Sequence, residues 1–446
     1  MKTIDMTEGP LKKQILFFSL PLIASNLLQV LFNLADVAVV GRFAGAASLG
    51  SVGSTTILVC LFTGLTIGLG SGVNAVAALF MGAKSDRDVE RTVHTSLILS
   101  LAAGFLLWLL GAVFAKAMLS ALNTKDILFD GAALYLKIYF ISMPASALFN
   151  FGNGVYSAVG NTRKPLIYLT ISGVVNVILN LFFVISLGMD VDGVAWASVI
   201  SMYISAVLII ISLFKENNCY ALDIKKLCFD TEKARRVLAI GIPSALQNAI
   251  FQFANLFIQA AVNSFDAVMV EGNSAATNAD SIVYNTMSAF YVACTSFMSQ
   301  NYGARNKERI IKSFRISTAY SFIVGMALGL GILALGHPFL GLFTTEEAVI
   351  EAGMQRLLIM GLSYGWSAFM DSTIAASRGL SRTAVPTFIV IMGSCVFRII
   401  WVYTIFAAFH TIQSLYLLYI FSWSLTAAAE IIYFNHAWKQ VCRELN

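Results

Sequence analysis

An apolar stretch between residues 19 and 41 carries polar side chains at helical spacing: Asn26, Gln29, Asn33 and Asp36. At about 100° per residue they fall within about 80° of one another, so a helix would present them as one polar stripe. An Asp near the centre of a membrane-spanning helix costs about 2.5 to 3.5 kcal/mol on insertion scales, so Asp36 is expected to face a bundle interior or a wet cavity. The alternative is that Asp36, close to Arg42, is solvated at the membrane interface.

Asp36 offers chemistry that the rest of the stripe lacks. A carboxylic acid in a desolvated site can bind and release a proton near neutral pH, whereas an amide cannot. A matching stretch in the second half of the chain carries a stripe made only of amides: Asn248, Gln252, Asn255, Gln259 and Asn263. This difference places the expected ion or proton site in the first half of the chain.

Other polar residues in the first half could join such a site. They lie in two further apolar stretches: Asn150, Asn153 and Tyr156 in one, and Asn176 and Asn180 in the next. The i, i+4 spacing of Asn176 and Asn180 puts both amides on one helix face. The alternative is that these side chains only form hydrogen bonds between neighbouring helices.

The second half has its own ionisable residues in apolar stretches: Asp280, Tyr284, Asp371 and Arg398. An unpaired Arg near the middle of a span is costly, so Arg398 is expected to have a carboxylate partner, with Asp371, Asp280 or Glu430 as the options. A fixed ion pair that holds the helices together is the expected role, rather than a moving charge.

The composition requires elements that cross a membrane. Hydrophobic residues make up 58% of the chain and charged residues 12%, and the mean hydropathy is +0.78. Helices rather than strands are expected, because long apolar runs must satisfy their own backbone in lipid. The predicted fold is all-α with twelve spans, at residues 14–40, 49–80, 92–118, 132–157, 165–188, 193–214, 236–265, 270–300, 313–338, 350–377, 385–409 and 413–436.

Positive charges set the predicted topology. Lys and Arg cluster before the first span and after the second, fourth, sixth and eighth, while the intervening loops are acidic. The positive-inside rule then places both termini in the cytoplasm. Topology accounts for the net charge of +5, so no nucleic-acid partner is expected.

The chain repeats itself about halfway along. The pattern of Pro21, Asn26 and Asn33 recurs as Pro243, Asn248 and Asn255. Each half holds six spans, so the halves should have the same orientation and be related by an axis along the membrane normal. We expect a first lobe at 1–214, a polar linker at 215–235 and a second lobe at 236–446, with a central cavity between the lobes.

Two local patterns predict how the spans bend and pack. Pro21 and Pro243 each remove a helical hydrogen bond, so a kink is expected at both. Gly64, Gly68 and Gly72 have the small-xxx-small spacing that permits close helix contact.

The sequence lacks the motifs of several functional classes. The chain has no P-loop lysine motif, no H-E-x-x-H and no G-x-S-x-G, which argues against ATP-driven pumping and common hydrolytic mechanisms. An intramembrane lipid enzyme would need a nucleophile or metal cluster, and none is evident. All four His lie near predicted span ends. We expect no enzyme activity, no cofactor and no metal centre.

The sequence resembles the multidrug and toxic compound extrusion (MATE) antiporters, and most of all their DinF-like prokaryotic branch. The resemblance covers nearly the whole chain and is carried by Asn33-Leu34-Ala35-Asp36 with Val40-Gly41-Arg42, by Gln300-Asn301-Tyr302-Gly303-Ala304, and by Arg378-Gly379. It implies that Asp36 is the proton or sodium carboxylate, that protonation bends the first helix at Pro21, and that Asn153 and Asn176 belong to the same network. Relatives often have Asp where this chain has Asn180, and the seventh span lacks the Glu of the NorM-like branch.

The resemblance implies a monomeric secondary antiporter in the cytoplasmic membrane. It would export amphipathic, cationic small molecules in exchange for protons, by alternating access between two lobes. The missing acids weaken the case for sodium. Sodium coupling stays an alternative, as does a lipid-linked oligosaccharide flippase of the same superfamily, which would need a large basic cavity.

Overall fold

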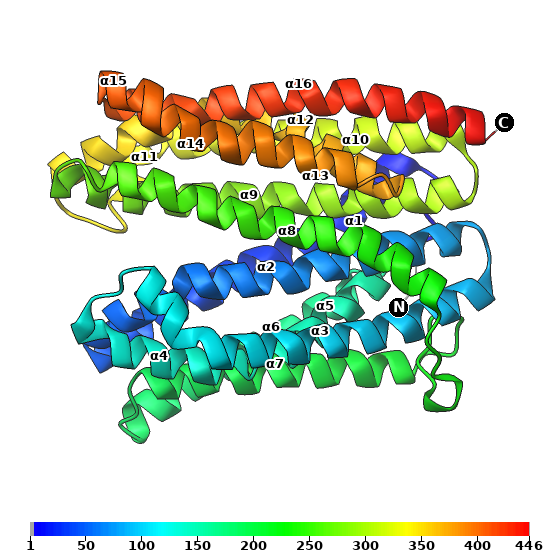
Figure 1. Ribbon diagram of the computed structural model, residues 1–446, viewed down its shortest axis with the longest axis horizontal. Helices are drawn as coiled ribbons and strands as arrows, with labels where there is room; N and C mark the ends of the chain where they lie inside the picture. The colour runs from blue at the N-terminus through cyan, green and yellow to red at the C-terminus, as the bar shows by residue number, and fades with distance from the viewer. Residues whose placement is uncertain (1–3, 446) are drawn as a thin grey trace. The chain divides into compact units, whose positions relative to one another are not determined.

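The computed structural model describes residues 4–445, and within that range the chain has helices and no strands (Figure 1). The first half contains α1 (Leu11–Val39), η1 (Val40–Ala44), α2 (Ala46–Gly82), α3 (Asp86–Ala121), α4 (Asp126–Phe140), α5 (Met143–Ala158), α6 (Arg163–Leu181), η2 (Phe182–Ser186) and α7 (Val191–Phe214). The linker carries η3 (Ile224–Lys226). The second half contains α8 (Thr231–Val262), α9 (Ala267–Gly303), α10 (Lys307–Ala334), α11 (Gly336–Leu340), α12 (Glu347–Gly379), α13 (Ala384–Val390), η4 (Ile391–Val396), α14 (Phe397–Trp401), η5 (Val402–Phe406), α15 (Ala407–Phe409) and α16 (Ile412–Glu444).

Each of the twelve predicted spans corresponds to one helix or to one interrupted helix, so the all-α prediction is confirmed. Nine of the described helices are long and apolar enough to cross a membrane, or ten if α4 and α5 count as one span. α9 and α12 are similarly long, with 37 and 33 residues. They fall outside that group because neither contains an 18-residue stretch that is apolar enough and nearly free of charge.

Two kinds of interruption were not predicted. α4 and α5 are bent by 47° where one continuous span was expected, and Pro144 near the start of α5 explains the break because its ring cannot follow an unbroken helical turn. The spans that contain α1, α6 and α13 pass into five- or six-residue π-helical segments. Such segments are rare in proteins overall, and those that occur are often found at functional sites.

The described residues form two compact units. Residues 24–249 form the first with residues 4 and 5, and residues 6–23 and 250–445 form the second. The boundaries of these compact units lie inside α1 and α8. The division into two lobes joined by a linker at 215–235 stays a prediction. Each of these helices gives one part to each unit.

Contacts within each unit explain this division. The segment before α1 is fixed to the second unit, because Asn301 donates to the Met6 carbonyl (3.1 Å) and Arg309 donates to the Gly9 carbonyl (2.9 Å). In the first unit, Gly64, Gly68 and Gly72 of α2 face α8. A Cβ on Gly68 would lie 2.3 Å from the backbone nitrogen of Ala245. The close helix contact predicted from the glycine spacing is confirmed.

We expect Gly68→Ala to destabilise the protein by about 1–3 kcal/mol, because the added methyl group meets backbone atoms of α8 that cannot move aside cheaply. The matched control is Gly53→Ala, on the exposed side of the same helix, where an added Cβ has nothing within 4 Å. That change should be neutral or stabilising by about 0.5–1 kcal/mol, since Ala is the better helix former. Thermal unfolding of the purified variants in detergent measures both, and equal melting temperatures would contradict the contact.

Candidate functional site

The first unit brings Asp36, Asn180 and Asn176 together. The Asn180 amide nitrogen donates to the Asp36 carboxylate and to the Asn176 side-chain oxygen, the latter at 3.3 Å. Asn180 is 0% exposed and Asn176 is 6% exposed, while Asp36 is half-buried. Ser198 of α7 is a further hydrogen-bond partner of Asp36. The carboxylate predicted from the α1 stripe is thus held among three helices.

Close packing of α1 against α6 creates this arrangement. A Cβ on Gly173 would lie 1.8 Å from the ring of Phe32, so a larger residue there would force the ring to move. Gly173, Asn176 and Asn180 lie at i, i+3 and i+7 on one face of α6, and Phe32 precedes Asp36 by one helical turn on α1. The Phe32–Gly173 contact therefore sets the depth at which Asp36 meets Asn180.

Both helices change character just beyond the site. The π-helical segment η1 begins four residues after Asp36, and η2 begins two residues after Asn180. A π-helical segment leaves the regular i to i−4 hydrogen-bond pattern, so the helix is locally easier to rearrange. Asp36 and Asn180 lie on regular helix directly next to these weaker segments.

The partners of Asp36 are neutral. Within residues 4–445 no Lys or Arg forms an ion pair with it, and the side chains that bind it are an amide and a hydroxyl. Neutral donors compensate a buried carboxylate only in part, whereas a guanidinium would fix its charge. The arrangement suits a carboxyl group that gains and loses a proton.

The other predicted residues of the first unit are spread along its helices. Asn150 donates to Thr66 (3.2 Å) and to the Ser146 carbonyl (2.9 Å), and Asn248 donates to the Gly64 carbonyl (3.1 Å). These amides join helices. Three candidates from the stripe and its neighbours are partly or largely accessible without a direct bond to Asp36: Gln29, Asn33 and Asn153. Asn26 is half-buried.

Tyr156 is fully buried, so it does not line a cavity in this conformer. Its hydroxyl lies 2.5 Å from the Ser212 hydroxyl and donates to Glu216 at 3.2 Å. Glu216 also pairs with Lys164. Tyr156 therefore belongs to a polar cluster at one end of α5 and α7.

In the second unit, Asp280 forms a buried ion pair with Arg356 of α12, a residue that the sequence analysis did not single out. Tyr364 also donates to Asp280, and Arg356 reaches Asn273 at 2.8 Å. Arg356 is 3% exposed. Both members of the pair lie in the first half of spans predicted to run in the same direction, and this shared depth could have suggested the pairing.

The expectation that Arg398 pairs with a carboxylate is wrong for the described residues: none forms a salt bridge with it. Arg398 donates to the Ser422 hydroxyl at 3.2 Å, and its guanidinium lies 4.8 Å from the ring centre of Tyr419 and 5.7 Å from that of Phe251. Aromatic faces can stabilise a desolvated cation. Asp280, one of the expected partners, forms its ion pair with Arg356 instead.

Asp371 is half-buried on α12, and Arg378 and Arg398 both act on it electrostatically. Tyr284 of α9 is 53% exposed. The second unit thus separates its ionisable groups into the Asp280–Arg356 pair and a looser group around Asp371.

Accessible polar stripes run along α8 and α9. On α8, Gln252 is half-buried, Asn255 is exposed, and Gln259 donates to Asn263 at 2.9 Å. The α9 stripe was not predicted. Its members have regular spacing of three and four residues: Ser274, Asn278, Ser281, Asn285 and Ser288. A count of polar residues at helical period along the predicted eighth span would have found it. Such a face is unsuited to lipid and suits water or a polar solute.

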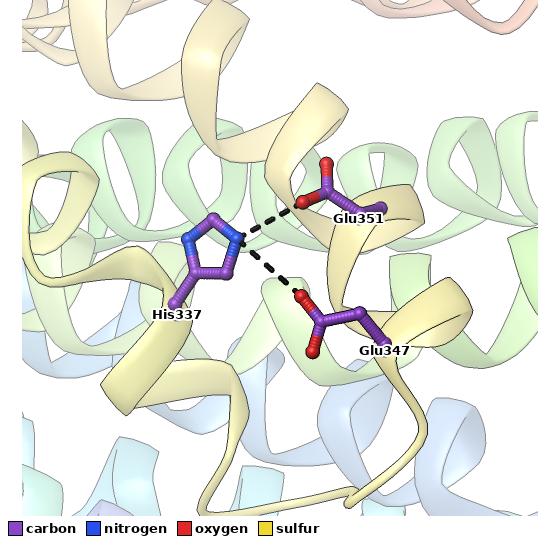
Figure 2. A group of neighbouring side chains, drawn as sticks. All are labelled: His337, Glu347 and Glu351. Atoms are coloured by element: carbon purple, nitrogen blue, oxygen red, sulfur yellow. Dashed lines mark hydrogen bonds and ion pairs between the residues drawn. The ribbon is translucent and has the colours of Figure 1, made fainter.

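One exposed group has the residue types of a metal site. Figure 2 shows His337 with Glu347 and Glu351, at 4.0 Å and 3.0 Å from the His337 Nε2. All three side chains are exposed. The contacts are those of an ordinary histidine–carboxylate hydrogen bond between α11 and α12, and we assign no metal role to them.

Comparison with known proteins identifies a family and several relatives. The MatE family profile matches residues 21–182 and 243–404. A probable multidrug resistance protein, YoeA, of Bacillus subtilis is 26% identical over 388 residues, covering 84% of this chain and 83% of that protein. A FAD transporter of Shewanella oneidensis is 24% identical over 81% of this chain and 80% of its own length. The multidrug export protein MepA of Staphylococcus aureus is 22% identical, covering 85% of both.

Solved structures share the fold. An outward-facing multidrug resistance MATE family transporter of the MOP superfamily matches with a TM-score of 0.91 and 21% identity, covering 99% of this chain and 100% of that chain. A MOP superfamily transporter from Pyrococcus furiosus matches with a TM-score of 0.92 and 21% identity, covering 99% of each chain. The relatives and neighbours are transporters and not enzymes.

We expect Arg356→Leu to destabilise the second unit by about 2–4 kcal/mol, because it leaves the half-buried Asp280 carboxylate without its counter-ion. Asp280→Asn in the same chain should recover part of the loss. The control is Arg382→Leu, which breaks the exposed pair with Glu444 and should cost less than about 1 kcal/mol. Thermal unfolding in detergent measures the three variants. A loss for Arg356→Leu no larger than for the control would contradict the buried pair.

Proposed function

This chain belongs to the MatE family of multidrug efflux transporters, and we propose that it is a secondary antiporter that exports amphipathic, cationic small molecules in exchange for protons. The observation that supports this proposal is the Asp36 carboxyl, held by Asn180 and Ser198 with neutral donors only. A group in this setting changes charge when its surroundings change.

The proposed cycle uses this property. In the outward-open state Asp36 takes up a proton, and its bonds with Asn180 and Ser198 rearrange. The loss of charge weakens the attraction for a cationic substrate, which leaves to the outside. The lobes then rock inward, and Asp36 releases the proton to the cytoplasm. Alternating access of this kind is general for two-lobed transporters.

The accessible surfaces of the second unit fit an amphipathic substrate. The amides of α8 and the hydroxyls and amides of α9 offer neutral hydrogen-bonding groups beside apolar surface. Arg356 and Arg398 are buried and engaged with Asp280 and Ser422. They do not offer the basic surface that a lipid-linked oligosaccharide flippase would need.

The distribution of Lys and Arg over the loops indicates the orientation in the membrane. The chain is a multi-pass membrane protein, and we propose that it lies in the cytoplasmic membrane with both termini inside, because its Lys and Arg alternate from loop to loop. We propose that it works as a monomer.

Sodium coupling is the second candidate. Hard cations prefer oxygen ligands, and the side-chain oxygen of Asn180 has no hydrogen-bond partner among the described residues. With Asp36 it would supply two oxygens. Proton coupling is favoured because the site contains only one carboxylate.

We expect Asp36→Asn to reduce proton-driven export of a cationic dye to the level of protein-free liposomes, since an amide cannot carry the proton. Proteoliposomes loaded with ethidium under an imposed pH gradient measure this, and a sodium gradient at constant pH tests the second candidate. The control is Asp190→Asn, an exposed acid of the same unit. Intact export by Asp36→Asn under a pH gradient would refute the proton assignment, and FAD can be tested as an alternative cargo.

We also expect Gly173→Ala to impair export although residue 173 touches no substrate in the proposed cycle. The new methyl group would collide with Phe32, separate α1 from α6 and weaken the Asp36–Asn180 bond. Phe32→Leu in the same chain should restore part of the activity by making room. Efflux rates normalised to folded protein measure the effect, and wild-type rates for Gly173→Ala would contradict it.

A further inference from the structure

We infer that Glu430 of α16 is a second proton-exchanging group, located in the second unit, whereas Asp36 belongs to the first. This inference extends the proposed proton-coupled function. Glu430 is 0% exposed, and neither of its carboxyl oxygens has a hydrogen-bond partner among the described residues. An ionised carboxylate without hydrogen bonds inside a membrane helix is very costly, so the group holds a proton in this conformer.

The neighbours on α16 do not relieve this burial. Ser422, Thr426, Glu430 and Phe434 follow one another at four-residue spacing on the buried face. The Thr426 hydroxyl donates to the Ser422 carbonyl (2.7 Å) and lies 3.0 Å from the Ser394 hydroxyl. On the other side, the Phe434 ring packs against Phe314 at 4.8 Å. The turns on both sides of Glu430 are therefore already engaged.

The charged groups that act on Glu430 lie on α12, which packs against α16. They are Arg378, which favours the ionised form, and Asp371, which opposes it. Asp371 and Arg378 are seven residues apart and share a face of α12. On α14, Arg398 acts on Asp371, and on α16 itself Tyr433 lies within electrostatic reach of Glu430.

This arrangement assigns different charge states to the two acids. Asp371 has two guanidinium groups acting on it, those of Arg378 and Arg398, whereas only Arg378 is shared with Glu430. Two carboxylates that compete for one cation do not both ionise at low cost. Of the two, Asp371 has the surroundings that favour the ionised form more, and we assign the proton to Glu430, whose carboxyl oxygens have no hydrogen-bond partner among the described residues. A shift of Arg378 toward Glu430 would reverse the preference and release the proton.

Infrared difference spectroscopy tests the protonation directly. Wild-type protein minus Glu430→Gln should show the carbonyl band of a protonated carboxyl at neutral pH, and the band should shift after transfer to D₂O because the proton exchanges with water. The matched control, Glu444→Gln, changes an exposed acid on the same helix and should not remove the band. Asp371→Asn should weaken it, because the opposing charge is removed and Arg378 then acts on Glu430 without a competitor. Absence of the band, or a band that never shifts in D₂O, would overturn the inference.

Transport provides the second readout. Glu430→Gln should keep the wild-type melting temperature, since the amide imitates the neutral acid, but should move fewer protons per exported ethidium than the wild type. An unchanged proton-to-ethidium ratio would overturn the role in exchange. The infrared result does not depend on Asp36, so failure of the Asp36 proposal and failure of this inference are distinguishable.

Discussion

The cost of burying charge in helices that cross a membrane governs this protein. Each ionisable side chain in a span must find an opposite charge, find neutral donors or lose its charge. Asp280 is paired with the opposite charge of Arg356, and Asp36 is held by the neutral amide of Asn180. These solutions differ in how firmly they hold the charge, because a guanidinium fixes a carboxylate whereas an amide leaves it free to titrate. The difference separates residues that stabilise the fold from those suited to coupling.

The two halves of the chain differ in where they carry acidic residues. The first and seventh spans keep the same Pro and Asn pattern, but only the first carries an acid. In the second unit the acids lie instead on α9, α12 and α16, where they are offset by arginines or fully enclosed. The same family profile matches both halves, and they differ in where their charges are placed.

Packing and helix irregularity position these charges. Gly173 lets α1 approach α6, and Gly68 lets α2 approach α8. The π-helical segments η1 and η2 then follow the Asp36 site on both of its main helices. A tightly packed contact beside weaker helical segments can hold a carboxyl group precisely in one state and still permit rearrangement between states.

The sequence by itself determined the helical class, the twelve spans, the duplication and Asp36 as the principal candidate. Hydropathy, charge alternation and spacing along a single helix are local properties, so they can be read without knowing which helices touch. The same patterns correctly indicated close contact at Gly68, and the family resemblance agrees with the relatives found.

Only the tertiary structure decided the partners. In the structure Asp36 accepts a hydrogen bond from Asn180, 144 positions away in the sequence, and Asp280 forms an ion pair with Arg356. Arg398 contacts aromatic rings and the Ser422 hydroxyl instead of an acid. It also placed the unit boundaries inside α1 and α8 and broke the fourth span at Pro144. The reason is physical: a pair depends on the depth and rotation of two separate helices, and a rotation by one residue, about 100°, changes which side chain faces the partner.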